Sequence, residues 1–209
     1  MARSEFAQTS HPRSHPIGLR GLAGPRRIET MKILLPALLC ALSLSFQACS
    51  KDPVQATKSK ADQGDAKAQY NLGNMYADGE GVAKNEAEAV KWYRKAADQG
   101  LAEAQFNLGN MYREGLGVVK DEAEAVKLYR KAAEQGDADA QFNLGVSYAK
   151  GLGVVKDEAE AYKWYLLAGA QGDEEAKKGI ERLERVLTPA QRAEGQKRAR
   201  EFKPVKAAP

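Results

Sequence analysis

The chain has 209 residues, of which 32 are Lys or Arg, 28 are Asp or Glu and two are His, so its formal net charge is +4. Residues 1–48 contain six of the basic residues, two of the acidic ones and both histidines (His11 and His15), so the remainder carries 26 charges of each sign. A neutral remainder without histidine lacks the basic footprint of a nucleic-acid-binding protein and the side chain that most general-base and zinc sites use. We therefore expect neither a nucleic-acid partner nor a metal.

The first segment, residues 1–30, holds five arginines without a periodic pattern, and we interpret it as an extension upstream of the true start at Met31. Residues 33–46 (ILLPALLCALSLSF) then form an apolar run of 14 residues behind Lys32. A membrane-spanning helix needs roughly 20 apolar residues, whereas this shorter run is typical of the core of a secretory signal. The sequence therefore predicts a signal peptide over residues 31–48.

Residues 46–49 (FQAC) resemble the lipobox of bacterial lipoproteins, although Phe46 stands where leucine is usual. In that family the signal is cut before the cysteine, so the resemblance implies a lipid on Cys49 that holds the protein to a membrane. Ser50 follows, where lipoproteins kept at the inner membrane often carry Asp. A periplasm-facing lipoprotein of the outer membrane is thus favoured over the inner one. The alternative is a plain secreted protein in which Cys49 is an incidental thiol.

Residues 61–187 repeat the same pattern every 36 residues, starting at Gln69, Gln105 and Gln141. The second copy reads QFNLGNMYREGLGVVKDEAEAVKLYRKAAEQG. A fixed period in this range predicts stacked units that bury their apolar faces against one another. Residues 54–64 align with residues 90–100 without the Trp-Tyr pair, so we expect residues 49–60 to form a tether and a degenerate N-terminal cap.

Each unit is predicted to contain two helices. In the second unit, Ala104, Leu108 and Tyr112 recur at i, i+4 and i+8 on one face of a first helix over residues 102–114. Gly115 and Gly117 follow and can end that helix by adopting positive φ. The second helix then begins at residue 121.

Two features of the unit predict how its helices pack. Asp121, with Glu124 three residues later, is typical of a capping box at the start of the second helix. Four residues form the apolar face of that helix: Ala125, Tyr129, Ala132 and Ala133. Gly109 lies inside the first helix, where glycine costs about 1 kcal/mol relative to alanine, and Gly73 and Gly145 repeat it. This recurring cost indicates a close approach by the alanine-rich helix. We therefore predict an all-α fold, an α-solenoid of stacked antiparallel helix pairs.

The C-terminal part departs from the repeat. Residues 173–187 stand where a fourth first helix belongs, but Glu181 replaces the packing glycine. Thr188 and a proline after it predict a capping helix over residues 188–202, followed by a disordered tail over residues 203–209. Leu166 and Leu167 replace cations of the earlier copies. They are expected to pack against the C-terminal helices or, alternatively, to form an exposed apolar patch for a partner.

The Leu-Gly-x-x-Tyr core of each copy (Leu72-Gly73 with Tyr76, and its two equivalents) is tetratricopeptide-like. The 36-residue period, the G-x-G-V loop and the closing A-A-x-Q-G are similar to the Sel-one-like repeat family. The resemblance implies an α-solenoid that works as a scaffold or adaptor, and several bacterial members are envelope proteins. Cysteine-rich members have been linked to β-lactam binding or hydrolysis. Those members are built on disulfide-stapled helix pairs, and that alternative is weakened because residues 61–187 contain no cysteine.

The resemblance to tetratricopeptide grooves also implies a binding face. Five asparagines of the first helices point away from the apolar face: Asn71, Asn74, Asn107, Asn110 and Asn143. Stacked amides on a concave face could bond the backbone of an extended peptide, or they could satisfy groups within the stack. The sequence has no P-loop or dinucleotide fingerprint, so we expect no cofactor, no catalytic residue and no enzyme. The favoured function is a scaffold for an envelope protein or peptide. The remaining alternative is binding of cell wall or anionic lipid by the basic residues from 192 to 206.

Overall fold

The computed structural model describes residues 53–205. The chain divides into two units, Met1–Ser50 and Lys51–Pro209, and the described residues belong to the second. They form nine helices and no strand. The helices are α2 (Pro53–Asp62), α3 (Ala66–Asp78), α4 (Glu86–Asp98), α5 (Ala102–Glu114), α6 (Glu122–Glu134), α7 (Ala138–Lys150), α8 (Glu158–Ala170), α9 (Glu174–Glu184) and α10 (Pro189–Glu201).

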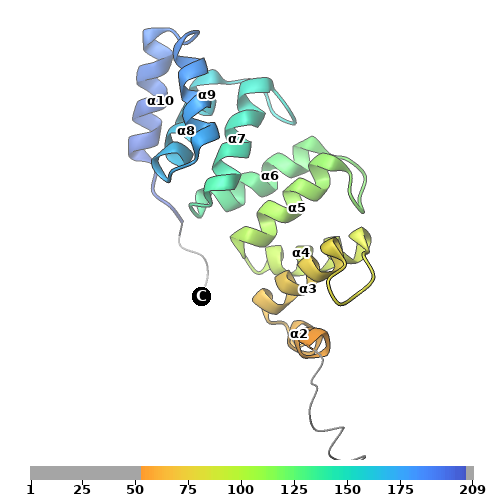
Figure 1. Cartoon of the computed structure of the whole chain (residues 1–209). Coiled ribbons are helices and arrows are strands. Elements are labelled where there is room, and N and C mark those ends of the chain that lie inside the picture. Colours follow the sequence, from red (N-terminus) through yellow and green to blue (C-terminus); the bar gives the residue numbers. More distant parts are fainter. Residues whose placement is uncertain (1–52, 206–209) are drawn as a thin grey trace, which may run out of the picture. The chain divides into compact units, whose positions relative to one another are not determined.

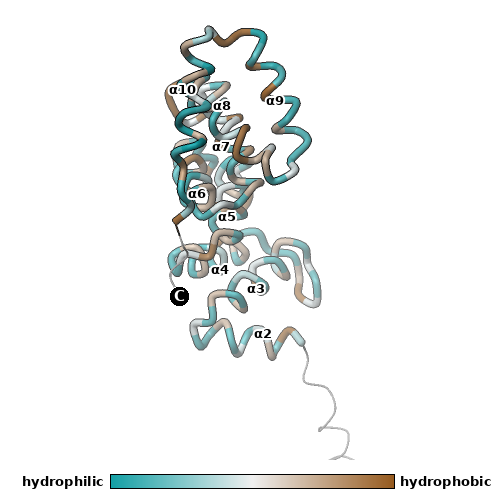
Figure 2. The backbone as a smooth tube through the Cα atoms, turned by 90° about the vertical axis from the view of Figure 1, so that its left-hand side faces the viewer, coloured by the Kyte–Doolittle hydropathy of each residue, from teal (hydrophilic) through white to brown (hydrophobic). Residues whose placement is uncertain are grey.

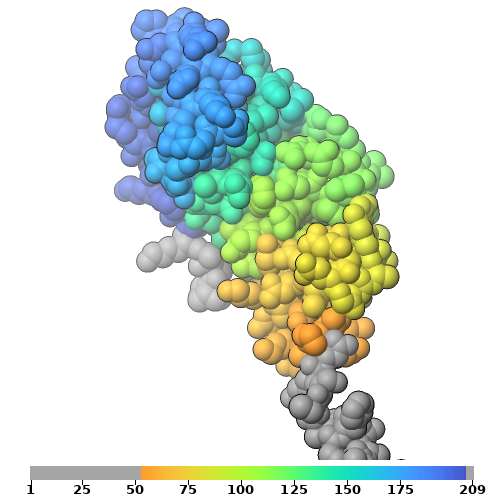
Figure 3. Space-filling view, viewed as in Figure 1, coloured from red at the N-terminus to blue at the C-terminus, as the bar shows by residue number. Residues whose placement is uncertain are grey.

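The helix pairs follow the 36-residue period. The first helices α3, α5 and α7 and the second helices α4, α6 and α8 all have 13 residues. Each first helix packs on its own second helix, which packs in turn on the next first helix. The pairs therefore follow one another in chain order (Figure 1), as neighbouring bands of colour in the space-filling view (Figure 3). The predicted all-α solenoid is confirmed.

Local sequence sets the helix ends. Gly115 ends α5 with φ 74°, and its N–H donates to Met111 O at 2.9 Å. The predicted capping box at Asp121 is formed in one half, because Asp121 accepts from the Glu124 N–H at 2.9 Å while the Glu124 carboxylate accepts from Lys127 Nζ at 2.9 Å. Both halves are formed at the start of α10, between Thr188 and Gln191.

The helical glycines make room for tyrosine rings. A Cβ built on Gly109 would lie 2.7 Å from Cε1 of Tyr129 in α6, a separation that real Cβ atoms do not show. Gly73 and Gly145 stand in the same relation to the tyrosines of α4 and α8. The predicted close approach is therefore present, but a tyrosine ring occupies the space rather than the alanines. Those alanines form the buried core beside it, Ala132 and Ala133 both being fully buried.

The loop between the two helices of a repeat packs against the preceding repeat. Gly117 has φ 67°, and a Cβ there would overlap the backbone of Glu86 and Ala87 at the start of α4. Gly153 meets the start of α6 in the same way. The second glycine of each loop thus does more than end a helix, because it lets the loop pass over the preceding repeat. Figure 2 shows hydrophilic and hydrophobic stretches alternating along the helices that these loops connect.

The C-terminal helices close this end of the array. The helix α9 packs on α8, as predicted for a fourth first helix, and α10 also packs on α8. Gly195 permits this contact, since a Cβ there would lie 2.8 Å from Ala159 O. Residues 203–205 were expected to belong to a disordered tail. Instead they lie against α6, where the Val205 N–H donates to Glu134 O at 2.8 Å and satisfies a carbonyl at the end of that helix.

Candidate functional site

The five asparagines expected to bind a partner lie on three successive first helices. Asn71 and Asn74 belong to α3, Asn107 and Asn110 to α5, and Asn143 to α7. Asn71 is exposed, whereas the other four are half-buried. The hydrogen bonds of the half-buried four decide whether their amides remain available to a ligand.

Two of these amides accept hydrogen bonds from buried tyrosines of the second helices. The hydroxyls of Tyr93 and Tyr129 donate to Oδ1 of Asn74 and Asn110 respectively, each at 2.7 Å. Burial raises the pKa of both tyrosines to about 12, so the hydroxyls keep the proton that they donate. The third repeat has Val146 at the corresponding position. Asn74 and Asn110 therefore join the two helices of one pair.

Two further asparagines bond across repeats. Asn107 Nδ2 lies 3.4 Å from Asn74 Oδ1, and Arg113 Nη1 donates to Asn143 Oδ1 at 2.9 Å. Asn107 and Asn143 thus bond to other residues of the neighbouring repeat and not to the asparagines one period away. Four of the five asparagines favour the structural alternative.

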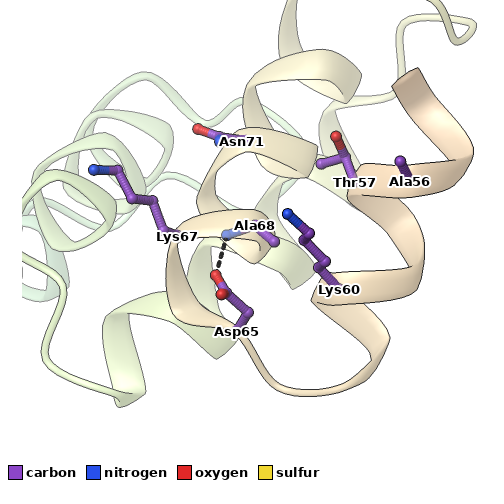
Figure 4. A pocket seen from close by; sticks show the side chains of 7 residues that line it. All are labelled: Ala56, Thr57, Lys60, Asp65, Lys67, Ala68 and Asn71. Atoms are coloured by element: carbon purple, nitrogen blue, oxygen red, sulfur yellow. Dashed lines mark hydrogen bonds between the residues drawn. The ribbon is translucent and has the colours of Figure 1, made fainter.

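Asn71 lies at the N-terminal end of the described array, where no earlier first helix covers it. It lines a pocket of about 270 Å³ between α2 and α3. Figure 4 shows the other lining residues, which are Ala56, Thr57, Lys60, Asp65, Lys67 and Ala68. The Asp65 carboxylate caps α3 by accepting from the Ala68 N–H at 2.7 Å. The amide of Asn71 and the exposed ammonium groups of Lys60 and Lys67 therefore give this pocket its chemistry, which suits a carboxylate or a carbonyl oxygen.

Each repeat contains a pair of bonded glutamines, one of them buried, that was not anticipated from the sequence. Gln105 is 4% exposed, and its Nε2 donates to Ala97 O at 3.1 Å. Its Oε1 accepts from Gln135 Nε2 at 2.8 Å. The pairs Gln99–Gln69 and Gln171–Gln141 repeat this bond at 2.7 and 2.9 Å. Both glutamines recur at the 36-residue period, and this recurrence could have revealed the pair in the sequence. Because the two side chains bond to each other, we assign them a structural role.

The leucine pair on α8 is packed rather than open. Leu166 and Leu167 are half-buried against a core cluster that contains Leu183 and Leu187. The earlier copies carry Arg94 and Arg130 at the first of these positions, and each donates to the hydroxyl of a tyrosine in the next repeat, Tyr112 and Tyr148. The next position in that series is Glu184. Leu166 therefore replaces an arginine at the one copy in which the following unit has no tyrosine hydroxyl to accept a hydrogen bond.

Two arginines of the basic C-terminal helix form ion pairs or hydrogen bonds within the protein. Arg198 Nη1 lies 3.0 Å from a Glu160 carboxylate oxygen, and Arg198 Nε lies 2.8 Å from Glu194. Arg192 donates to Glu184 O at 2.7 Å. Lys197 and Arg200 are exposed. The surface that could meet cell wall or anionic lipid is thus less basic than the sequence suggests.

Within residues 53–205, no group of three or more His, Cys, Asp or Glu side chains is placed to hold a metal ion. No described helix is long and apolar enough to cross a bilayer. Cys49, the predicted lipid site, lies outside the described residues.

Comparisons with known proteins agree with the helix pairs. A family model of the Sel1 repeat matches residues 66–101, 102–137 and 138–173. A Sel1 repeat protein from Oxalobacter formigenes is 46% identical over 62% of this chain and 97% of its own, with a TM-score of 0.58. A protective antigen of uropathogenic Escherichia coli with an SLR fold is 32% identical over 76% of this chain, with a TM-score of 0.55. The match spans 42% of that antigen. No curated protein matches the sequence.

Proposed function

The chain belongs to the Sel1 repeat family, and we propose that it is a scaffold of the bacterial cell envelope that binds a peptide or protein partner. Sel1 repeat proteins are generally protein-interaction scaffolds, and the fold is typically non-enzymatic. Solenoids suit this work because their stacked units present an extended surface. The first-helix side of the array is the proposed binding face.

The observation that carries the proposal is the pocket at Asn71. The other four asparagines bond to neighbouring tyrosine, asparagine or arginine side chains, whereas Asn71 is exposed between α2 and α3. Lys60 and Lys67 add two positive charges to the same pocket of about 270 Å³. A partner segment that places a carboxylate or a backbone carbonyl there meets an amide N–H donor and ammonium groups together.

Site-specific crosslinking tests this proposal. Replacing Thr57, which lines the pocket, with the photo-crosslinking residue p-benzoylphenylalanine should give one dominant adduct in cells of the native host, and Lys67→Glu in the same chain should remove it. The matched control carries the crosslinker at Val119, which is 88% exposed on a loop. Equal adducts from both positions, or an adduct that survives Lys67→Glu, would contradict binding at this pocket.

The envelope part of the proposal rests on the apolar run at residues 33–46 and on Cys49. The intact mass of the protein from a membrane fraction of its host tests it. We expect a chain that begins at Cys49 and carries acyl groups, and we expect Cys49→Ser to move the protein into the soluble fraction. An unlipidated chain that begins at Met1 or Ala2 would contradict the envelope assignment and leave the scaffold role standing.

The proposal includes no catalytic role. Several buried polar groups of the described repeats bond within the fold, since the Tyr93 and Tyr129 hydroxyls donate to asparagines and Gln105 bonds to Ala97 O and Gln135. Labelling of the purified protein by a fluorescent penicillin, abolished by an excess of unlabelled penicillin, would instead support the β-lactam alternative.

A further inference from the structure

Residues 202–205 lie across the second and third repeats as a bound peptide would. The Phe202 ring meets the Trp164 ring edge to face, with centroids 5.5 Å apart and planes at 71°. Three residues later the Val205 N–H donates to Glu134 O at 2.8 Å. Pro204 lies 4.0 Å from the position that a Cβ of Gly136 would take. One aromatic contact and one backbone bond thus hold residues 202–205 on α8 and the end of α6.

The corresponding receptor residues occur two periods earlier, on α4 and at the end of α2. Trp92 stands two periods before Trp164 in the corresponding helix, and Asp62 and Gly64 stand two periods before Glu134 and Gly136. The glutamine bonds beside the two regions are alike, since Gln99–Gln69 and Gln171–Gln141 have lengths of 2.7 and 2.9 Å. The second repeat lacks the site, since Leu128 occupies the tryptophan position.

At Trp92 no segment of the described chain takes the place of Phe202. The Lys95 ammonium lies over the indole, 3.8 Å from the ring centroid. Apart from its two chain neighbours, no described residue lies within 4 Å of the position of a Cβ on Gly64. A shallow depression of about 300 Å³ surrounds the ring. Its lining residues are Glu88, Lys91, Trp92, Arg94, Lys95 and Asp98. A lysine is a mobile cover, because its long side chain can leave the ring and remain in water.

We propose that the outer surface of α4 around Trp92 binds an extended peptide segment of a partner protein, one that carries an aromatic residue beside an acidic residue. The aromatic ring takes the place that Phe202 takes on Trp164, and it displaces the Lys95 ammonium. The acidic residue follows from charge, since Arg94 and Lys95 replace Leu166 and Leu167 of the occupied site. The displaced ammonium then pairs with the partner's carboxylate. This surface shares no residue with the pocket at Asn71, so the two proposals stand or fall separately.

A labelled peptide tests the proposal on the full chain. The probe is AREFEPVKA, which is residues 199–207 of this chain with Glu in place of Lys203, and the readout is fluorescence anisotropy. We expect saturable binding that weakens about tenfold or more when the peptide phenylalanine becomes alanine. Trp92→Leu in the protein should weaken binding equally. This variant is a fair test because leucine occupies the same position natively in the second repeat.

Two further variants separate the site from its alternatives. Lys95→Glu, an exposed change, should weaken the acidic probe about two- to fivefold, as expected for a solvent-exposed ion pair. Trp164→Leu should leave the affinity unchanged. The proposal is overturned if the probe shows no saturable binding at millimolar concentration, or if a folded Trp92→Leu chain binds it as tightly as the native chain. Binding lost in Trp164→Leu but kept in Trp92→Leu would place the peptide on the tail site and also refute the proposal.

Discussion

Gly109 is required because the Tyr129 ring fills the space that a side chain would need. A Cβ at this position would lie 2.7 Å from Cε1 of Tyr129 and 3.4 Å from the carbonyl oxygen of Ala125. The tyrosine is 1% exposed and has no room to move. We expect Gly109→Ala to lower the free energy of unfolding by about 1–3 kcal/mol through overpacking, despite the gain in helix propensity. Urea unfolding followed by circular dichroism measures this loss.

Gly169 provides a matched control within the same array. It stands in α8 where the earlier copies have Ala97 and Ala133. A Cβ there would meet only the flexible end of Ile180 closely, at 3.2 Å. Gly169→Ala should therefore keep the stability or raise it by up to about 1 kcal/mol through helix propensity. A similar loss in both variants would refute the argument from the tyrosine ring.

Asp137 gives the stability of the fold a defined pH dependence. Burial raises the pKa of its carboxyl, although the side chain accepts from the Ala140 N–H at 2.7 Å. Since the folded pKa is raised, the folded chain holds this proton at a pH where the unfolded chain has lost it. Its contribution to stability therefore falls as pH rises from the unfolded pKa of about 4 through the folded one. Asp137→Asn keeps the cap and should remove this slope, which thermal unfolding between pH 4 and 7 would reveal. An unchanged slope would contradict it.

At the scale of the helix, the buried glutamine of a pair fastens its repeat to the preceding one. Gln105 bonds to Ala97 O in α4 and to Gln135 after α6, so it connects three helices. Gln105→Leu should cost about 1–3 kcal/mol, since it removes two hydrogen bonds from a buried site. Adding Gln135→Ala to that variant should then cost little more, because the bond is already lost.

Gln63 is the control for the glutamine prediction. It occupies the same position as Gln135 in the repeat pattern, but its side chain is exposed and its Nε2 donates to Ser59 at 3.3 Å. Gln63→Ala should therefore change the stability by less than about 0.5 kcal/mol. If Gln63→Ala and Gln105→Leu lowered the free energy of unfolding equally, the pair bond would contribute nothing specific. Additive costs for Gln105→Leu and Gln135→Ala would show the same.

The helix boundaries were predictable because the residues that set them lie within one unit. The left-handed conformation of Gly115 and the side-chain cap at Asp121 involve only a few neighbouring residues, so both could be predicted from the repeat sequence. The partners of Asn74 and Asn143 were not, since Tyr93 and Arg113 reach them only after the helices have stacked. The same holds for the ring that fills the space at Gly109.

At the scale of the whole array, α10 protects aromatic side chains that an open end would expose. Tyr162 is 1% exposed beneath Gly195, and Trp164 is 3% exposed beneath Phe202. Stacked repeats need such a cap because an internal repeat ends in an apolar face. The sequence predicted that Leu166 and Leu167 of α8 pack against the C-terminal helices. It did not predict the close contact at Gly195 or the docking of residues 203–205 on α6, since both depend on contacts between distant segments.

A single substitution can detach this cap while keeping its sequence in the chain. In Gly195→Leu the new Cβ would lie 2.8 Å from Ala159 O, which is backbone and cannot move aside. We expect the free energy of unfolding to fall by on the order of 3 kcal/mol, as when a large core side chain is lost. The tryptophan emission should shift to longer wavelength as water reaches Trp164. Arg200→Ala, on the exposed side of α10, should do neither. If Gly195→Leu left both the unfolding midpoint and the emission unchanged, α10 would not be the cap of the array.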